Sequence, residues 1–321
     1  MNQQVLLKHK LLNNLQLFGL FLLLSGLVVY IAFMIAGGFF ALFAMLMVVM
    51  LYISNAYLAP SFILRMYKAQ YVPYESAPIL YDLVDELSSL AGLSQSPNLY
   101  YVPSSVINSF TVGRPNDAAI AISDGILKSL SYEEIAGILG HEISHIKNDD
   151  IRVMTFADIA GRIVKILSIM GQIMIIVTLP LTLLLNVEIN WLPLIIMIFS
   201  PIGADLIQLG MSRIREYEAD LGSAMLLGTA TPLASALTKI EQFEHRFFYS
   251  LLPSIRKIPE PSLLRTHPSN EDRIKRLMEV QEKIEHEPLK HDADVLSGKR
   301  PHHHITSKSS KPKRHFNGFW Y

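Results

Sequence analysis

The chain has 321 residues, of which 17% are charged and 50% are apolar. An average soluble domain has about 25% charged residues, so this composition indicates that part of the chain lies in a membrane. The 28 basic and 28 acidic residues balance, which removes the electrostatic case for a nucleic-acid-binding protein. The sequence has no cysteine, which excludes disulfide scaffolds, thiolate zinc sites and thiol proteases. Any bound metal must therefore use His, Asp or Glu.

The first long apolar stretch, residues 11–64, contains no Asp, Glu, Lys or Arg. A bilayer core of about 30 Å needs about 20 apolar residues in a helix, so this stretch is long enough to cross twice. Gly37 and Gly38 mark the expected turn between spans near 15–35 and 39–57. The alternative is a cleaved signal peptide, which is disfavoured because its apolar region would be only about 7–15 residues long.

The polar block that follows begins with a predicted helix at 77–90, where leucines recur at three-and-four spacing. Three short extended runs come next, at 98–102, 108–112 and 118–122, separated by turn residues. They predict a small antiparallel meander.

A further helix is predicted from a capping box, with Ser131 at the N-cap and Glu134 three residues on. It contains an H-E-x-x-H motif formed by His141, Glu142 and His145. The two histidines are one helical turn apart, so both imidazoles can reach one metal ion. Glu142 projects beside them as a candidate base for a water molecule at the metal.

A second apolar stretch predicts another membrane hairpin, with helices at 166–187 and 191–209 and a turn around Glu188. Its prolines leave open a kinked or partly inserted hairpin. Together with the first stretch, it predicts four membrane helices.

A catalytic zinc usually takes three protein ligands and keeps a fourth position for water. Glu216 and Asp220 follow the second hairpin and are four residues apart, so they share a helix face. Glu216 is the expected third ligand, and Asp220 is expected to accept the N–H of a ligating histidine, first of all His141. Glu218 is the rival ligand.

The expected fold class is α+β, mainly α, in an integral membrane protein with one zincin-like metallopeptidase domain and a small antiparallel sheet. The expected segments are an N-terminus at 1–14, a hairpin at 15–57, domain parts at 58–163 and 211–289, a second hairpin at 164–210 and a disordered basic tail at 290–321. Basic residues flank the hairpins and are missing from their turns. The termini and the domain should therefore face the cytoplasm of a cell membrane.

Several motifs together resemble the HtpX family of membrane-bound zinc metallopeptidases, which are relatives of the CAAX prenyl proteases. Besides H-E-x-x-H, they are Arg215-Glu216-x-x-Ala219-Asp220, Asn108-Ser109-Phe110, Asn148, Asp150, Thr266-His267-Pro268 and Arg273. The resemblance covers about 15–277. Ser109 and Thr111 stand where the family more often has alanines.

The resemblance implies one Zn²⁺ per chain, held by His141, His145 and Glu216, with Glu142 as general base. It also implies a role in membrane-protein quality control, with membrane proteins, above all misfolded ones, and unfolded polypeptides as substrates.

Two further roles are expected at the site, and the first of them has two candidate residues. His267 or Arg273 is expected to stabilise the developing oxyanion. Asn108, Ser109 and Phe110 are expected to bind an extended substrate as an added strand.

Three other functions compete with this interpretation. A membrane scaffold that keeps zinc only for folding would have no use for Glu142. A transporter would carry several charges within its spans, whereas only Asp205 qualifies. A prenyl-protein protease is the third, although the resemblance to that branch is weaker.

Overall fold

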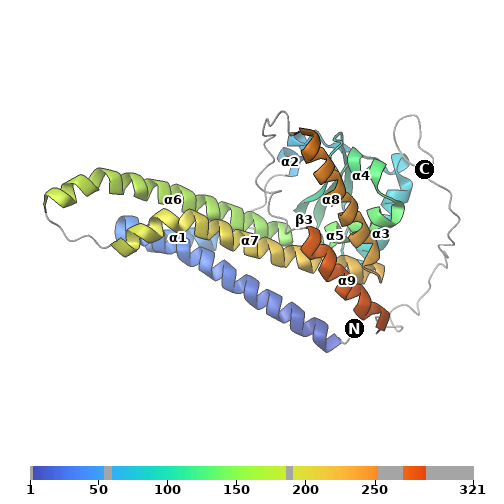
Figure 1. Ribbon diagram of the computed structural model, residues 1–321, viewed down its shortest axis with the longest axis horizontal. Helices are drawn as coiled ribbons and strands as arrows, with labels where there is room; N and C mark the ends of the chain where they lie inside the picture. Colours follow the sequence, from blue (N-terminus) through green and yellow to red (C-terminus); the bar gives the residue numbers. More distant parts are fainter. Residues whose placement is uncertain (1–2, 54–59, 186–190, 252–269, 287–321) are drawn as a thin grey trace.

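The computed structural model describes residues 3–53, 60–185, 191–251 and 270–286. Figure 1 shows three long helices that project as a bundle from a domain of shorter helices and a small sheet. They are α1 (Gln3–Ile53), α6 (Asp150–Leu184) and α7 (Trp191–Leu227). The expectations for the Glu188 turn, for His267 and for the tail at 290–321 concern residues outside the described ranges.

Helix α1 is broken where the first turn is predicted. Ala36 and Gly37 have non-helical backbone angles, with φ of −145° and 75°, and the second value lies in the left-handed region that glycine adopts readily. The rings of Phe21 and Tyr52 are 5.2 Å apart. A straight helix would separate these residues by about 46 Å at its rise per residue. The chain therefore folds back at Gly37 as a hairpin.

Three helices among the described residues are long and apolar enough to cross a membrane. They lie at Leu11–Ile53, Asp150–Pro180 and Trp191–Leu227. The prediction of four separate membrane helices is not confirmed, because the two arms of α1 form one kinked element and its second arm is described only as far as Ile53.

Helices α6 and α7 extend well beyond the predicted membrane segments. Helix α6 starts at Asp150, and α7 continues to Leu227 without a break. Pro180 and Pro201 lie inside these helices and end neither of them. The same helices that carry the apolar segments therefore enter the polar domain.

The sheet is mixed, so the prediction of an antiparallel meander is wrong. Its strands are β1 (Gln70–Tyr71), β2 (Asn98–Val102), β3 (Ser109–Arg114) and β4 (Asp117–Ser123), in the order β1-β2-β4-β3. Strand β4 pairs parallel with β2 and antiparallel with β3. Its residues after Asp117 are all buried, which is typical of a central strand covered on both faces. Strand β3 is left at the edge.

The remaining elements surround this sheet and form the main core. They are α2 (Pro60–Met66), η1 (Tyr74–Ser76), α3 (Pro78–Ala91), α4 (Asp124–Ser129), α5 (Tyr132–Lys147), α8 (Thr231–Leu251) and α9 (Asn270–His286). The predicted capping box of α5 is confirmed, since Ser131 accepts from the Glu134 backbone and the Glu134 side chain accepts from the Ser131 backbone. Buried side chains of α5 join those of α3, β4 and α8 in one cluster.

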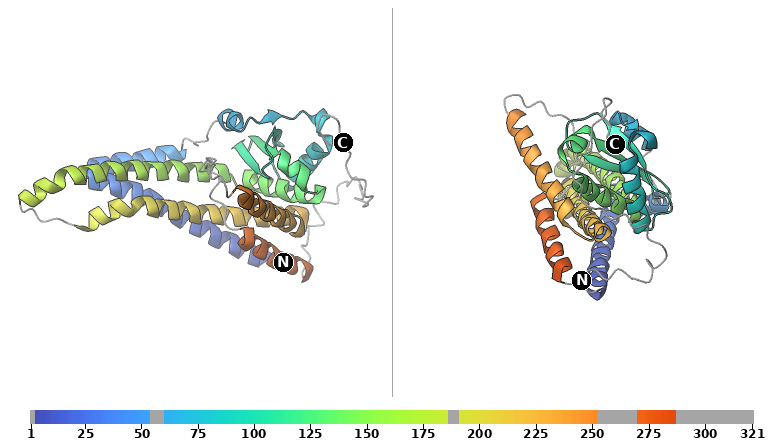
Figure 2. Two further views of the ribbon diagram at one scale, coloured as in Figure 1. Left: turned by 45° about the horizontal axis from the view of Figure 1, so that its top comes forward. Right: turned by 90° about the vertical axis from the view of Figure 1, so that its right-hand side faces the viewer.

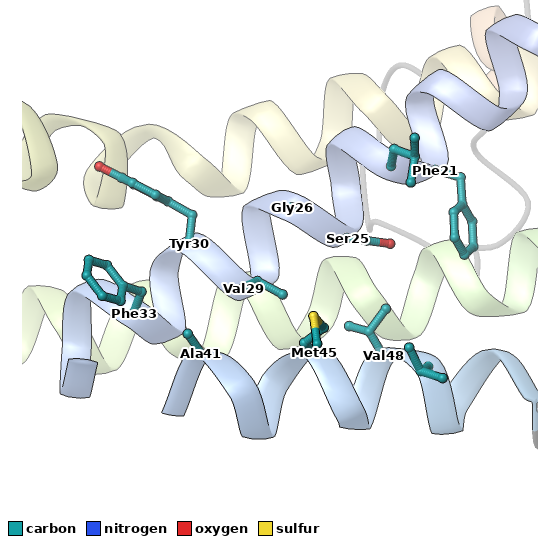
Figure 3. A pocket seen from close by; sticks show the side chains of 11 residues that line it. Phe21, Ser25, Gly26, Val29, Tyr30, Phe33, Ala41, Met45 and Val48 are labelled. Atoms are coloured by element: carbon teal, nitrogen blue, oxygen red, sulfur yellow. The ribbon is translucent and has the colours of Figure 1, made fainter. Parts of the chain in front are cut away.

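The left view of Figure 2 also shows the domain at one end of the bundle. A groove opens between the two arms of α1, and Gly26, Tyr30 and Met45 are among its lining residues (Figure 3). The groove is apolar and lies within the bundle. A cluster of buried charged residues lies instead where α5 meets α6 and α7.

Candidate metal centre

Helices α5 and α7 approach each other closely because both carry a glycine at the contact. A Cβ added at Gly140 would lie 2.9 Å from the Ser223 Oγ, and one at Gly222 would overlap the Ser144 side chain. The Ser223 hydroxyl also donates to the Gly137 carbonyl at 2.8 Å. This contact sets the face of α5 that carries the H-E-x-x-H motif against α7.

His141, His145 and Glu216 come together at this contact, with one ligand atom from each within 4.8 Å of the others. The two Nε2 atoms of the histidines are 3.0 Å apart. The Glu216 carboxylate lies 3.4 Å from His141 Nε2 and 3.6 Å from His145 Nε2. Tetrahedral ligands at the usual zinc distance of about 2.0–2.1 Å would be about 3.3 Å from one another. The three side chains therefore fit a single metal ion.

Each imidazole is oriented from behind by a carboxylate. His141 Nδ1 lies 2.9 Å from Asp220 Oδ1, and His145 Nδ1 lies 2.8 Å from Asp150 Oδ2. A carboxylate at Nδ1 holds the proton on that nitrogen and leaves Nε2 as the ligand atom. Asp220 was expected in this position from its spacing to Glu216. For Asp150, the sequence offers only the family resemblance.

Two buried arginines in turn hold these carboxylates. Arg273 on α9 donates from Nη2 and Nε to the two oxygens of Asp220, at 2.6 and 2.9 Å. Its Nη1 lies 3.2 Å from Glu216. Arg215 donates to Asp150 at 2.8 Å and also binds Glu218. Paired in this way, the buried charges avoid the large cost of burying an isolated ion.

His141 is buried and strongly affected by these neighbours. Burial and the Arg273 guanidinium lower the pKa of His141, but hydrogen bonds with Asp220 and Glu216 and the Glu216 charge outweigh them and raise it to about 9. A metal needs the neutral imidazole, so a metal ion and a proton would compete for His141.

Glu142 directly follows His141 on α5, and its side chain is held by two residues of β3. The hydroxyl of Ser109 donates to Glu142 Oε1 and that of Thr111 to Oε2, both at 2.6 Å. Glu142 itself is buried. The sequence predicts a substrate-binding role for Ser109 but no contact of either hydroxyl with Glu142, because no local spacing relates β3 to α5.

The other predicted residues are placed as follows. The Arg273 guanidinium is paired with Asp220 and Glu216, and its expected role at a developing oxyanion stays a prediction. Glu218 pairs with Arg215 and lies outside the group of three ligands. Phe110 packs against Tyr67, with ring centroids 4.6 Å apart.

The role of Asp150 is tested by Asp150→Asn. We expect this change to weaken the affinity for a divalent metal by about 10- to 100-fold, as found when carboxylates behind ligating histidines are removed. Metal affinity of the purified protein is measured by competition with a chelating dye. Asp149→Asn is the matched control, because Asp149 points toward Arg152 instead and asparagine tolerates its φ of 55°. Equal losses in the two variants would contradict the assignment.

Comparison with known proteins agrees with this geometry. Residues 76–281 match peptidase family M48. The chain is 35% identical over 247 residues to a protease HtpX homolog of Persephonella marina, covering 69% of this chain and 81% of the relative. It is 33% identical over 290 residues to protease HtpX of Legionella pneumophila strain Corby, covering 83% of this chain and 99% of the relative.

Among solved structures, the chain is similar to Ste24p of S. mikatae at 19% identity and a TM-score of 0.42, covering 84% of this chain and 66% of the other. The family match covers more than half of the chain, and the HtpX relatives extend across both its membrane helices and its domain. A metal held by two histidines and a glutamate is what a metalloprotease of this kind requires. The chain therefore belongs to peptidase family M48, as an HtpX-like membrane metallopeptidase.

Proposed function

We propose that this protein is a zinc endopeptidase that cuts membrane proteins, misfolded ones above all, at the cytoplasmic face of the membrane. The observation that carries this proposal is the ligand group of His141, His145 and Glu216 together with a buried carboxylate, that of Glu142, directly after His141 on α5. A site that bound metal only for folding would have no use for such a carboxylate.

The donor set supports zinc as the metal. Two imidazoles and one carboxylate are the ligands of many hydrolytic zinc sites, which keep a further position open. When bound, zinc would supply a Lewis acid that polarises the scissile carbonyl and makes water more acidic.

The chain's own residues provide the proton transfers and the orientation. Glu142 accepts a proton from the attacking water at its carboxylate and delivers it to the departing amine nitrogen. Asp220 and Asp150 keep the Nδ1 protons of the histidines in place throughout. Arg273 and Arg215 prevent these carboxylates from turning away.

The position of the site supports membrane proteins as substrates. Leu20 of α1 lies beside Gly210 of α7, and Glu216 is only about 9 Å further along that helix at its rise per residue. Phe18 and Leu15, the next residues of α1 toward the domain, are apolar and more than half exposed. Lipid-facing surface therefore reaches nearly to the level of the metal ligands.

Removing the base tests the mechanism. Glu142→Gln should retain zinc but lose at least about 100-fold in the rate of cleavage, since general-base catalysis typically contributes 10²–10⁴-fold. Zinc content is measured by atomic emission, and cleavage by gel with a destabilised membrane protein and a soluble unfolded protein as substrates. Equal activity in the variant and the wild type would refute the role of Glu142. Cleavage of the soluble protein alone would refute the substrate class.

Orientation in the membrane is tested by labelling, which is simple because the chain has no cysteine. Ser94→Cys places one thiol at an exposed position of the domain. A membrane-impermeant maleimide should label it in inside-out vesicles and leave it unlabelled in intact cells. The cysteine-free wild type is the control, and labelling in intact cells would show that the domain faces the other side.

Strand β3 is the part of the site that we assign to the substrate backbone. It lies at the sheet edge, and the Asn108 backbone faces β4 through hydrogen bonds with Ser123 at 3.0 Å. In an antiparallel pair the backbone groups alternate in direction. The backbone N–H and C=O groups of Ser109 and Thr111 therefore face away from β4, toward the position where a substrate peptide would add as a strand.

This assignment is tested with peptides rather than protein variants. Methylating a peptide amide that pairs with β3 removes one hydrogen bond, so we expect kcat/KM to fall by about tenfold relative to the unmethylated peptide. Methylation several residues further from the cleaved bond is the control. A uniform response along the whole peptide would contradict strand addition.

A further inference from the structure

Both oxygens of the Glu142 carboxylate are held by hydroxyl groups from one strand. Ser109 Oγ and Thr111 Oγ1 each donate a hydrogen bond of 2.6 Å, one to each oxygen. The two residues are half-buried, while Glu142 is buried. Hydrogen bonds to an ionised group are shorter and stronger than those between neutral groups, as these distances reflect.

The alternation of β3 explains how one strand supplies both donors. Side chains two residues apart point to the same face of a strand. Ser109 and Thr111 therefore both face α5, whereas Phe110 and Val112 face the other way and pack in a cluster with Leu64. The packed face fixes the strand, so the two hydroxyls are presented to Glu142 from a rigid element.

We propose that Ser109 and Thr111 are positioning residues that fix the orientation of the Glu142 carboxylate. This inference rests on the proposed function of Glu142 as general base. The terminal torsion of a glutamate is broad, so an unsupported carboxylate would sample many orientations. Two donors on the two oxygens select one of them. Each oxygen keeps a second lone pair, with which it can accept a proton from water.

The same strand thereby links the substrate to the base. The backbone of Ser109 and Thr111 faces the position assigned to the substrate, and their side chains hold Glu142. The carboxylate and a peptide bound along β3 are therefore held by the same rigid element. The base and the scissile bond thus keep one relative position, which is the geometric condition for a large effective concentration.

The test uses Ser109→Ala and Thr111→Val in the full-length zinc-loaded protein, with Ser109→Thr and Thr111→Ser as variants that keep the hydroxyl. Each removal should lower kcat about tenfold with KM and zinc content unchanged, because positioning affects the reaction more than binding. The hydroxyl-keeping variants should recover most of this loss. Ser94→Ala is the matched control, since it removes an exposed hydroxyl that donates to Asn116 instead.

A second readout is independent of activity. In the metal-free protein, the infrared difference spectrum between each form and its Glu142→Gln counterpart isolates the carboxylate bands of Glu142. These bands should shift in Ser109→Ala and Thr111→Val and stay unchanged in Ser94→Ala.

The possible outcomes separate the two proposals. If the wild type cleaves and Glu142→Gln does not, but the Ser109→Ala/Thr111→Val double variant keeps the wild-type kcat and bands, the positioning role is overturned while the proposed function stands. If the wild type itself does not cleave, the proposed function fails, and an unshifted band in both single variants overturns the hydrogen-bonding role as well. Lower kcat with shifted bands supports both.

Discussion

The close contact between α5 and α7 is the constraint on which the rest of the site depends. His141 and His145 come from one helix and Glu216 from the other, and their ligand atoms meet only because Gly140 and Gly222 let the two helices approach. Packed interiors resist even small changes in volume. A Cβ at Gly222 would clash with the Ser144 side chain, so this position in particular requires glycine for the close contact.

Helix α7 makes this contact part of the membrane anchor. It carries an apolar segment, contacts α1 at Gly210 and then supplies Glu216 without an intervening loop. The rise of a continuous helix fixes the distance between the lipid-facing part and the ligand. A loop at this place would have left the height of the site above the bilayer variable.

Charged side chains surround the ligands in two successive layers, first carboxylates and then arginines. Asp220 and Asp150 lie behind the histidines, and Arg273 and Arg215 lie behind the carboxylates. Each charge is buried, and most have a second partner, since Arg273 also pairs with Glu216 and Arg215 with Glu218. The layers therefore hold the imidazoles in place more firmly than any single hydrogen bond. They also bring α9 into the site, although it supplies no ligand.

The sequence by itself determined the features that depend on local spacing. The capping box and the pair of histidines one turn apart follow the spacing of a helix, and the apolar segments stand out by their length and lack of charge. All three can be recognised without knowledge of the fold. Gly37 likewise marks the break in α1, because glycine readily adopts the positive φ found there.

The tertiary structure decided the strand order and the side-chain contacts between different helices and strands. The central position of β4 was missed, although its uniformly apolar run 118–122 is the signal of a strand buried on both faces. The pairing of His145 with Asp150 depends on the backbone turn at Asp149, with φ of 55°, which no helical period predicts. Ser109 and Thr111 reach Glu142 across more than 30 positions of sequence. Such contacts follow from packing, and the spacing of residues along the chain carries no record of them.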